Sequence, residues 1–362
     1  MKLQRKGIIA IFLVIICVII HLYSNNEMRV ENGYSSHFSS WFSEILRYCF
    51  GWIPVSIGDF LYGLLVFWLI WKLFRFLGRM FRKGKVPSRK KYFMGACLKA
   101  VLFCSSIYII FNIFWGINYN RKGIAWQIGL KMDKYSKEDL EHINCVLVDK
   151  INESKKVLIA DRVQYPSNKE LYAMVSDAYK KVSVQYSFLE YHPSSIKTSM
   201  WGWLGNYTGF TGYYNPFTGE AQLNTTVPEF LHPFIACHET AHQLGYSKEM
   251  EANFVGYLAA SSSSSQLFHY SVYLDLFVYA NRNLFFIDST SSKLYRKDLD
   301  PAVVKDLKDW FEFNRKHQSP IEPVVRWIYG KYLESNSQPQ GLLSYDEVTA
   351  FIISYYKKFG RI

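Results

Sequence analysis

The sequence predicts a mainly α-helical protein, in which N-terminal transmembrane helices precede an α+β domain with a small antiparallel sheet. Three long apolar stretches lie in the first third of its 362 residues. The remainder shows helical spacing of apolar residues, interrupted by one short region rich in Tyr, Thr, Trp and Gly. The first pattern is typical of membrane-spanning helices, and the second indicates a helical domain that also contains strands.

The apolar stretches cover residues 7–23, 50–71 and 100–118, and each approaches the ~20 residues that a helix needs to cross a bilayer. The first could instead be a cleaved signal peptide. No small-x-small pattern follows it, which favours an uncleaved anchor. We therefore predict a membrane domain over residues 1–118 and an extracytoplasmic domain over residues 119–362.

The charge distribution predicts the orientation in the membrane. The chain has a formal net charge of +12, and residues 1–118 carry nearly all of this excess. Residues 72–99, between the second and third stretches, contain many Lys and Arg residues and no acidic residue. The positive-inside rule then places the N-terminus in the cytoplasm and the C-terminal domain outside the cell membrane. This confined excess indicates contact with the lipid bilayer and argues against nucleic acid as a partner.

Helix signals recur through the C-terminal domain. Ser136 with Asp139, and Ser167 with Glu170, have the spacing of capping boxes that begin helices. Helical apolar spacing predicts further helices over residues 266–286, 301–317 and 321–335.

One region of this domain predicts strands instead. Its Tyr, Thr and Gly content and its turn signals indicate an antiparallel sheet with strands near residues 196–201, 209–214 and 220–223. The second and third strands flank the sequence NPFTG, which has the composition of a turn.

A short motif follows this region and carries the chemistry. His238-Glu239-Thr240-Ala241-His242 has the H-E-x-x-H pattern. On a helix, residues four apart share a face, so both imidazoles can bind one Zn²⁺ ion. Glu239 would then act as the general base toward the water that zinc activates. The alternative is that both histidines are ordinary helix residues without a metal.

The helix that carries this motif has signals at both ends. Pro233 fits its first turn, and Gly245 fits a left-handed C-terminal cap. Ser247 could then cap a second helix. Catalytic zinc sites use three protein ligands, so this second helix should supply the third.

Two glutamates compete for that third position. Glu249 and Asn253 are four residues apart and share a helix face, whereas Glu251 lies about 200° around the helix from Glu249. We predict Glu249 as the ligand, with Glu251 as the alternate. Asn253 would orient a ligand histidine through its side-chain oxygen.

The predicted sheet suggests how a substrate could be held. Zinc peptidases bind substrate as an added strand along a sheet edge, and residues 209–223 are the candidate edge here. Tyr213 and Tyr214 on this edge are candidate substrate-binding residues. Cys145 and Cys237 could form a disulfide outside the cell, although a buried, unpaired Cys237 is the competing interpretation. Asp59 in the second apolar stretch is either a functional intramembrane acid or a hydrated residue near the interface.

The chain resembles an uncharacterised family of bacterial membrane proteins, domain of unknown function 3810. The resemblance is carried by residues 238–259, by the preceding sequence GYYNPFTGEAQLN, and by WGINY at residues 115–119. It implies N-terminal spans and a zincin-like domain in which His238 and His242 bind metal and Glu239 is the base. It does not choose between Glu249 and Glu251, and it implies no substrate.

Together these patterns predict a membrane-anchored, gluzincin-like zinc metallopeptidase that hydrolyses peptide bonds of envelope or extracellular substrates. One alternative is a zinc-dependent amidase that acts on cell-wall material. Another is a non-catalytic envelope protein that keeps the fold and binds a partner.

Overall fold

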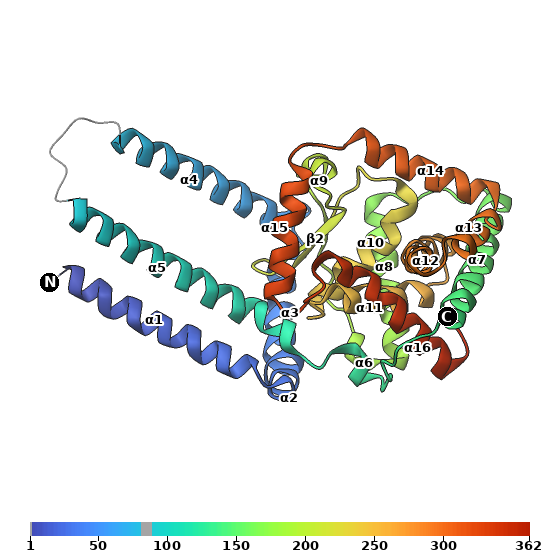
Figure 1. Cartoon of the computed structure of the whole chain (residues 1–362), viewed down its shortest axis with the longest axis horizontal. Coiled ribbons are helices and arrows are strands. Elements are labelled where there is room, and N and C mark those ends of the chain that lie inside the picture. The colour runs from blue at the N-terminus through green and yellow to red at the C-terminus, as the bar shows by residue number, and fades with distance from the viewer. Residues whose placement is uncertain (1, 81–88) are drawn as a thin grey trace.

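Three long helices extend from one side of a compact helical domain (Figure 1). The structure is a computed structural model that describes residues 2–80 and 89–362, so the centre of the predicted basic loop, residues 81–88, lies outside the described residues. The three helices are α1 (Lys2–Ser24), α4 (Ile57–Met80) and α5 (Arg89–Phe114). Each contains a segment long and apolar enough to cross a membrane: Arg5–Ser24, Ile57–Arg75 and Cys97–Phe114.

The second of these helices begins later than the sequence predicts. The apolar run from Phe50 was expected to be one helix, but the chain turns after Phe50 and α4 starts at Ile57. Pro54 disfavours helical backbone at the residue before it, which interrupts the run. Glu220 caps the new helix start, since its two carboxylate oxygens accept hydrogen bonds from the Ile57 and Gly58 N–H groups at 3.1 and 2.6 Å.

The segment between the first two long helices is a folded layer rather than a loop. It forms α2 (Glu27–Arg29), the π-helix η1 (Val30–Ser39) and α3 (Ser40–Phe50). Its buried polar side chains reach residues far along the chain: Ser35 donates to the Asn118 side chain at 2.7 Å, and Ser43 donates to the Gln243 carbonyl at 2.8 Å. This layer therefore packs into the domain that was predicted to begin at residue 119.

Long helices build the core of that domain. The predicted capping boxes are confirmed, because Ser136 and Ser167 each cap the helix that follows. The α-helices are α6 (Gly123–Gln127), α7 (Lys137–Ala160), α8 (Asn168–Gln185), α9 (Gly202–Thr208), α10 (His232–Gln243), α11 (Glu249–Ser262), α12 (Gln266–Ile287), α13 (Ser289–Lys297), α14 (Pro301–Lys316), α15 (Glu322–Ser335) and α16 (Val348–Phe359). The 3₁₀ segments are η2 (Gly116–Asn120), η3 (Ser187–Leu189), η4 (Glu229–Leu231) and η5 (Gly341–Glu347).

The two central helices of the core are α10 and α11. Every residue of α10 except Ile235 is buried, and α11 is buried from Glu251 to Ala260. They pack against each other and against α8 and α12. The predicted helices over 266–286, 301–317 and 321–335 are confirmed as α12, α14 and α15, with ends shifted by one residue.

The small sheet is mixed, not antiparallel as predicted. Its strands are β1 (Ile196–Thr198), β2 (Gly212–Asn215) and β3 (Glu220–Leu223), in the order β1-β3-β2. β2 and β3 form the expected antiparallel hairpin, but β1 runs parallel to β3. The helix α9, which was not predicted, lies between β1 and β2 in the chain. The hairpin that follows it places β3 beside β1. This order leaves β2 at an edge of the sheet.

Candidate metal centre

The helix α10 presents the three residues of the H-E-x-x-H motif from the centre of the core. Pro233 lies in its first turn, where a missing N–H costs no hydrogen bond. Gly245 follows its C-terminus with a φ of +85°, the left-handed conformation that glycine adopts readily. Ligand atoms of His238, Glu239 and His242 all lie within 4.8 Å of one another, so this group could hold a metal ion.

Glu249 on α11 completes a triangle with the two histidines. The Nε2 atoms of His238 and His242 are 3.1 Å apart. Oε2 of Glu249 lies 3.2 Å from the first of these nitrogens and 3.5 Å from the second. Three metal-binding atoms from two helices therefore converge on one buried point.

The size of this triangle fits a tetrahedral ion. Zinc bonds of ~2.0–2.1 Å to nitrogen and oxygen place the ligands of a tetrahedral site about 3.3 Å apart. The three observed sides scatter closely around this length. Oε2 of Glu249 and Oε2 of Glu239 are buried and have no hydrogen-bond partner among the described residues. Buried carboxylate oxygens without donors are rare, and a cation would satisfy them.

The electrostatics of the group favour a bound cation. Burial alone would raise the pKa of Glu249, but the imidazoles of His242 and His238 outweigh burial and hold that pKa well below its usual range. Burial alone would lower the pKa of His242, and the Glu249 carboxylate outweighs this effect and raises it to about 9. Burial raises the pKa of Glu239 to about 7. Two carboxyl groups thus share one dry volume, which costs free energy unless positive charge is present.

His242 is held in the tautomer that a metal ligand needs. Its Nδ1 lies 2.7 Å from the carbonyl oxygen of Tyr246. A carbonyl only accepts, so Nδ1 carries a proton, and Nε2 is the nitrogen that can give up its proton to bind a metal ion at the centre. Backbone carbonyls commonly orient metal-binding histidines in this way.

The C-terminal end of α10 is fixed by residues from the first third of the chain. Ser43 and Arg47 on α3 donate to the Gln243 carbonyl at 2.8 and 3.3 Å, and Arg121 donates to the Gly245 carbonyl at 3.2 Å. Helix ends leave such carbonyl groups unsatisfied, and cations near a helix C-terminus are favourable. Contacts from α3 and from Arg121 therefore hold the end of the helix that carries His242.

The helix α11 does not begin as predicted. Ser247 was expected to be its N-cap, but Lys248 occupies that position and Ser247 Oγ is buried without a partner among the described residues. The N–H of Glu249 instead donates to the side chain of Gln338 at 3.0 Å. The Tyr329 hydroxyl on α15 donates to Oε1 of Glu249 at 2.6 Å. Two C-terminal residues thus position this carboxylate, leaving Oε2 for the centre.

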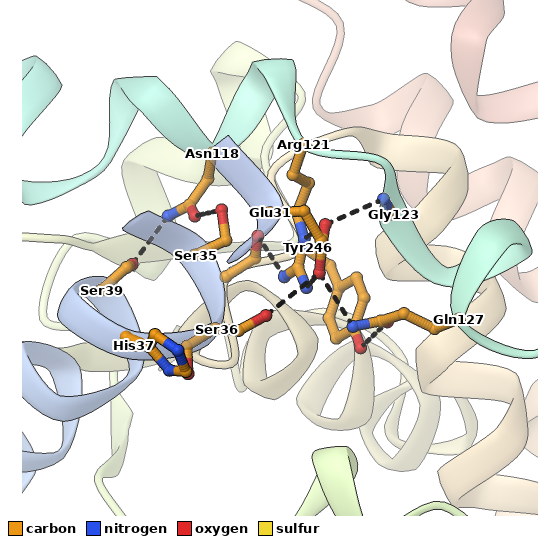
Figure 2. Close-up of polar contacts among 11 residues, drawn as sticks. Glu31, Ser35, Ser36, His37, Ser39, Asn118, Arg121, Gly123, Gln127 and Tyr246 are labelled. Carbon is orange, nitrogen blue, oxygen red and sulfur yellow. Dashed lines mark hydrogen bonds and ion pairs between the residues drawn. The ribbon is translucent and has the colours of Figure 1, made fainter. Parts of the chain in front are cut away.

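Glu251 points away from the histidines, as its position on the helix predicts. Its carboxylate lies against Gly123, where a Cβ would come 1.9 Å from Oε1. The neighbouring cluster is drawn in Figure 2: Glu31 and Arg121 form a buried bidentate ion pair with contacts of 2.6 and 3.0 Å. The Gly123 N–H and the Gln127 amide also donate to Glu31. Burial raises the pKa of Glu251 in this place.

Asn253 shares a face with Glu249 and is buried, but it makes no hydrogen bond to either histidine. Its side-chain nitrogen has no partner among the described residues. The predicted orienting contact to a histidine is therefore absent for Asn253 in this structure, and for His242 the Tyr246 carbonyl makes that contact.

The edge strand β2 passes directly beside Glu239. A Cβ at Gly212 would lie 2.6 Å from Oε1 of Glu239, so only glycine allows this approach.

The two candidate substrate-binding tyrosines have other contacts. The Tyr213 hydroxyl donates to Asp59 at the start of α4, and the Tyr214 ring packs on Trp115 with centroids 4.7 Å apart. Asp59 itself is buried and also accepts from the Met200 N–H at 2.6 Å, so it joins α4 to the sheet.

A cavity of about 560 Å³ opens onto the motif. His238 and Glu239 line it together with residues of β2, α12, α14 and α15, among them Gly212, Asp275, Trp310 and Tyr329. The cavity is large enough for several side chains of a peptide.

The two cysteines that could have formed a disulfide are both free thiols. Cys237 is buried beside the motif, and Cys145 is exposed.

A family model described as protein of unknown function (DUF3810) matches residues 34–353. The chain belongs to this family. The DUF3810 match begins inside η1 and ends inside α16, so it includes the N-terminal layer, α4 and α5 as well as the motif helices. No match was found among curated proteins or among solved structures.

Several residues of the site carried no signal in the sequence. Tyr329 and Gln338 lie 80 and 89 residues after Glu249, and only the fold brings them to it. Asp275 on α12 lines the cavity beside His238, and burial raises its pKa to about 7. An isolated Asp in an apolar helical run was the only available hint. The Tyr246 carbonyl is a backbone group, which no residue pattern identifies.

Proposed function

We propose that this chain is a membrane-anchored, zinc-dependent peptidase that hydrolyses peptide bonds of envelope or extracellular substrates. The observation that carries the proposal is the triangle of His238 Nε2, His242 Nε2 and Glu249 Oε2, whose sides of 3.1 to 3.5 Å match a tetrahedral zinc site. The nitrogen and oxygen donor set also suits zinc. Three protein ligands leave one position for water or substrate.

The residues around the triangle divide the chemical work. Zinc in such a site activates water and polarises a substrate carbonyl. Glu239 stands beside the first ligand, lines the cavity and has an unpaired buried oxygen, so it is placed to take a proton and later donate it to the leaving amine. Burial raises its pKa to about 7, and a bound cation would lower that pKa again.

The edge strand supplies a place for substrate. β2 has a sheet partner on one side only, since the strand order is β1-β3-β2. An extended peptide can add to such an edge through backbone hydrogen bonds. Gly212 lies beside Glu239, so a peptide bond of an added strand would lie near the proposed base.

The test uses the full-length chain in detergent or nanodiscs. Glu239→Gln should lower hydrolysis of a peptide library by ~10²–10⁴-fold, while zinc content measured by mass spectrometry stays at the wild-type level. His238→Ala should lose both zinc and hydrolysis. Glu153→Gln, an exposed change on α7, is the matched control and should alter neither.

Two results would contradict the proposal. If Glu239→Gln hydrolyses peptides at the wild-type rate, Glu239 is not the general base. A wild-type chain that hydrolyses no peptide in the library, but whose melting temperature rises on adding zinc, would indicate a non-catalytic metal-binding protein.

A further inference from the structure

The helix α15 lies across the ends of the long helices where they meet the domain (Figure 1). Its Tyr332 ring contacts Phe111 near the end of α5, with centroids 6.2 Å apart. The short helix α9 lies beside it, because Ser319 Oγ, just before α15, donates to the Tyr207 carbonyl at 2.7 Å. Both helices therefore sit at the level where the candidate membrane spans end.

One side of α15 is apolar and exposed. Ile321, Val324 and Ile328 are 63%, 55% and 56% exposed, and helical spacing places them on one side. Tyr332 continues the same side one turn further and is the residue that contacts the α5 span. The side of α15 that carries the exposed apolar residues is therefore the side that meets the span of α5.

The helix α9 extends this surface. Trp203, Leu204 and Tyr207 are exposed on it. Trp201, at its start, donates from its indole nitrogen to the Asp59 carbonyl of α4 at 3.2 Å, and its ring would contact a Cβ at Gly63 within the α4 span. The exposed apolar and aromatic residues of these two neighbouring helices, here called the α9–α15 face, adjoin two of the three candidate spans.

We propose that the α9–α15 face is embedded in the boundary between lipid headgroups and acyl chains. This rests on the proposal that α1, α4 and α5 cross the bilayer. Amphipathic helices with exposed Trp, Ile and Val lie in this boundary, and Trp and Tyr concentrate there at the ends of spans. Glu322 and Arg326 pair at 3.5 Å on the neighbouring side of α15, and Lys331 and Glu334 pair at 2.6 Å near its end, so charged groups flank the apolar side.

The embedded helix also forms a wall of the candidate active site. Glu322, Val325 and Tyr329 occupy the neighbouring side of α15 and line the cavity. Tyr329 holds Glu249 from this side. The membrane surface therefore supports the wall that positions one predicted zinc ligand.

A fluorescent NBD label attached to a single cysteine tests this placement. Ile328→Cys is compared with Leu294→Cys on α13, which is 54% exposed and lies on the side of the domain away from the spans (Figure 1). Both changes are made in a full-length chain whose other exposed or half-exposed cysteines are Ser, with the buried Cys237 retained. The chain is reconstituted in vesicles that contain a lipid-borne nitroxide.

Nitroxide lipid should quench the label at position 328 several-fold more strongly than the label at position 294, and aqueous iodide should show the reverse order. Equal responses at the two positions would overturn the proposal. So would shielding of position 328 from both quenchers, because that would mean a second copy or another protein covers the face. Neither readout requires hydrolysis, so failure of the peptidase proposal would leave the outcome interpretable.

Discussion

At the residue scale, the Tyr329 hydroxyl is the contact that fixes the Glu249 carboxylate. It donates to Oε1 at 2.6 Å and leaves Oε2 facing both histidines. Outer contacts of this kind typically contribute 10–100-fold to metal affinity. Tyr329→Phe should therefore weaken zinc binding by about 10-fold or more in a chelator competition assay.

The control for this prediction removes a hydroxyl elsewhere. Tyr172 donates to or accepts from Thr198 at 2.7 Å, with no contact to the motif. Tyr172→Phe should leave the zinc affinity unchanged. If both variants bind zinc as the wild type does, Tyr329 has no role in positioning the ligand.

The two glutamates on α11 should respond differently to substitution. Glu249→Ala removes a side chain whose Oε2 lies 3.2 Å from His238 Nε2, so zinc occupancy should fall sharply. Glu251→Ala should keep zinc, because that carboxylate lies against Gly123. Metal content of the two purified variants decides the question, and zinc loss in Glu251→Ala alone would reverse the assignment.

The site could be predicted from sequence only where local geometry determines it. The spacing of His238 and His242, and the 200° between Glu249 and Glu251, follow from helix periodicity and match the structure. The direction in which α11 turns its Glu249 face depends on α15 and Gln338, which are distant in sequence. For His242, the orienting contact predicted for Asn253 is made instead by the backbone carbonyl of Tyr246.

At the element scale, Arg121 joins the N-terminal layer to the turn after α10, because it forms a buried ion pair with Glu31 and donates to the Gly245 carbonyl. The side chains of Glu31 and Arg121 are 1% and 3% exposed and form a bidentate pair. Removing one partner of such a pair costs ~3–5 kcal/mol, because the other charge stays buried. Arg121→Met should therefore lower the melting temperature strongly and loosen the Gly245 turn.

A neighbouring exposed pair is the matched control. Lys122 and Glu27 approach to 2.7 Å, but Glu27 is 59% exposed. Surface pairs contribute ~0–1 kcal/mol, so Lys122→Met should change the melting temperature little. If Arg121→Met and Lys122→Met lower the melting temperature by similar amounts, burial of the Glu31–Arg121 pair is not what stabilises this layer.

The same pair predicts a pH dependence of stability. Burial alone would raise the pKa of Glu31, but Arg121 outweighs it and holds that pKa below its usual range. A lowered folded-state pKa contributes stability that is present above the unfolded value of ~4.3 and is lost as the pH falls through the folded pKa. The stability difference between wild type and Glu31→Gln should therefore be constant near pH 7 and shrink below about pH 4. A gap that does not change with pH would contradict an ionised Glu31.

Elements could be predicted where their signals are local. The capping boxes at Ser136 and Ser167 need only four residues each and were confirmed. The start of α4 was wrong because the apolar run through Pro54 looked continuous, and its true cap, Glu220, lies 160 residues away on β3. The parallel pairing of β1 with β3 was also missed, and so was the helix α9 that follows β1.

At the scale of the whole molecule, the predicted division at residue 118 separates parts that pack as one body. Ser43 and Arg47 from the first part donate to the Gln243 carbonyl at the end of α10, and Glu31 pairs with Arg121. Glu220 from the second part caps α4. A fragment of residues 119–362 would expose these groups to water and lose the pair to Arg121. We expect this fragment to melt without a cooperative transition in circular dichroism, whereas the full-length chain melts cooperatively. A stable, zinc-binding fragment would support the division.

The direction in which the chain crosses the membrane is the remaining prediction at this scale. The basic residues between the second and third candidate spans predict that this segment lies in the cytoplasm and the motif outside. Cys145 is an exposed native thiol on α7 and reports on the domain. In a chain that keeps Cys145 and Cys237 only, a membrane-impermeant maleimide should label intact cells at Cys145, since Cys237 is buried. Arg75→Cys, at the opposite end of the α4 span in a chain with Cys145→Ser, should be labelled only after lysis. The reverse pattern would place the domain in the cytoplasm. Any peptide substrates that reach His238, Glu239 and His242 would then be cytoplasmic.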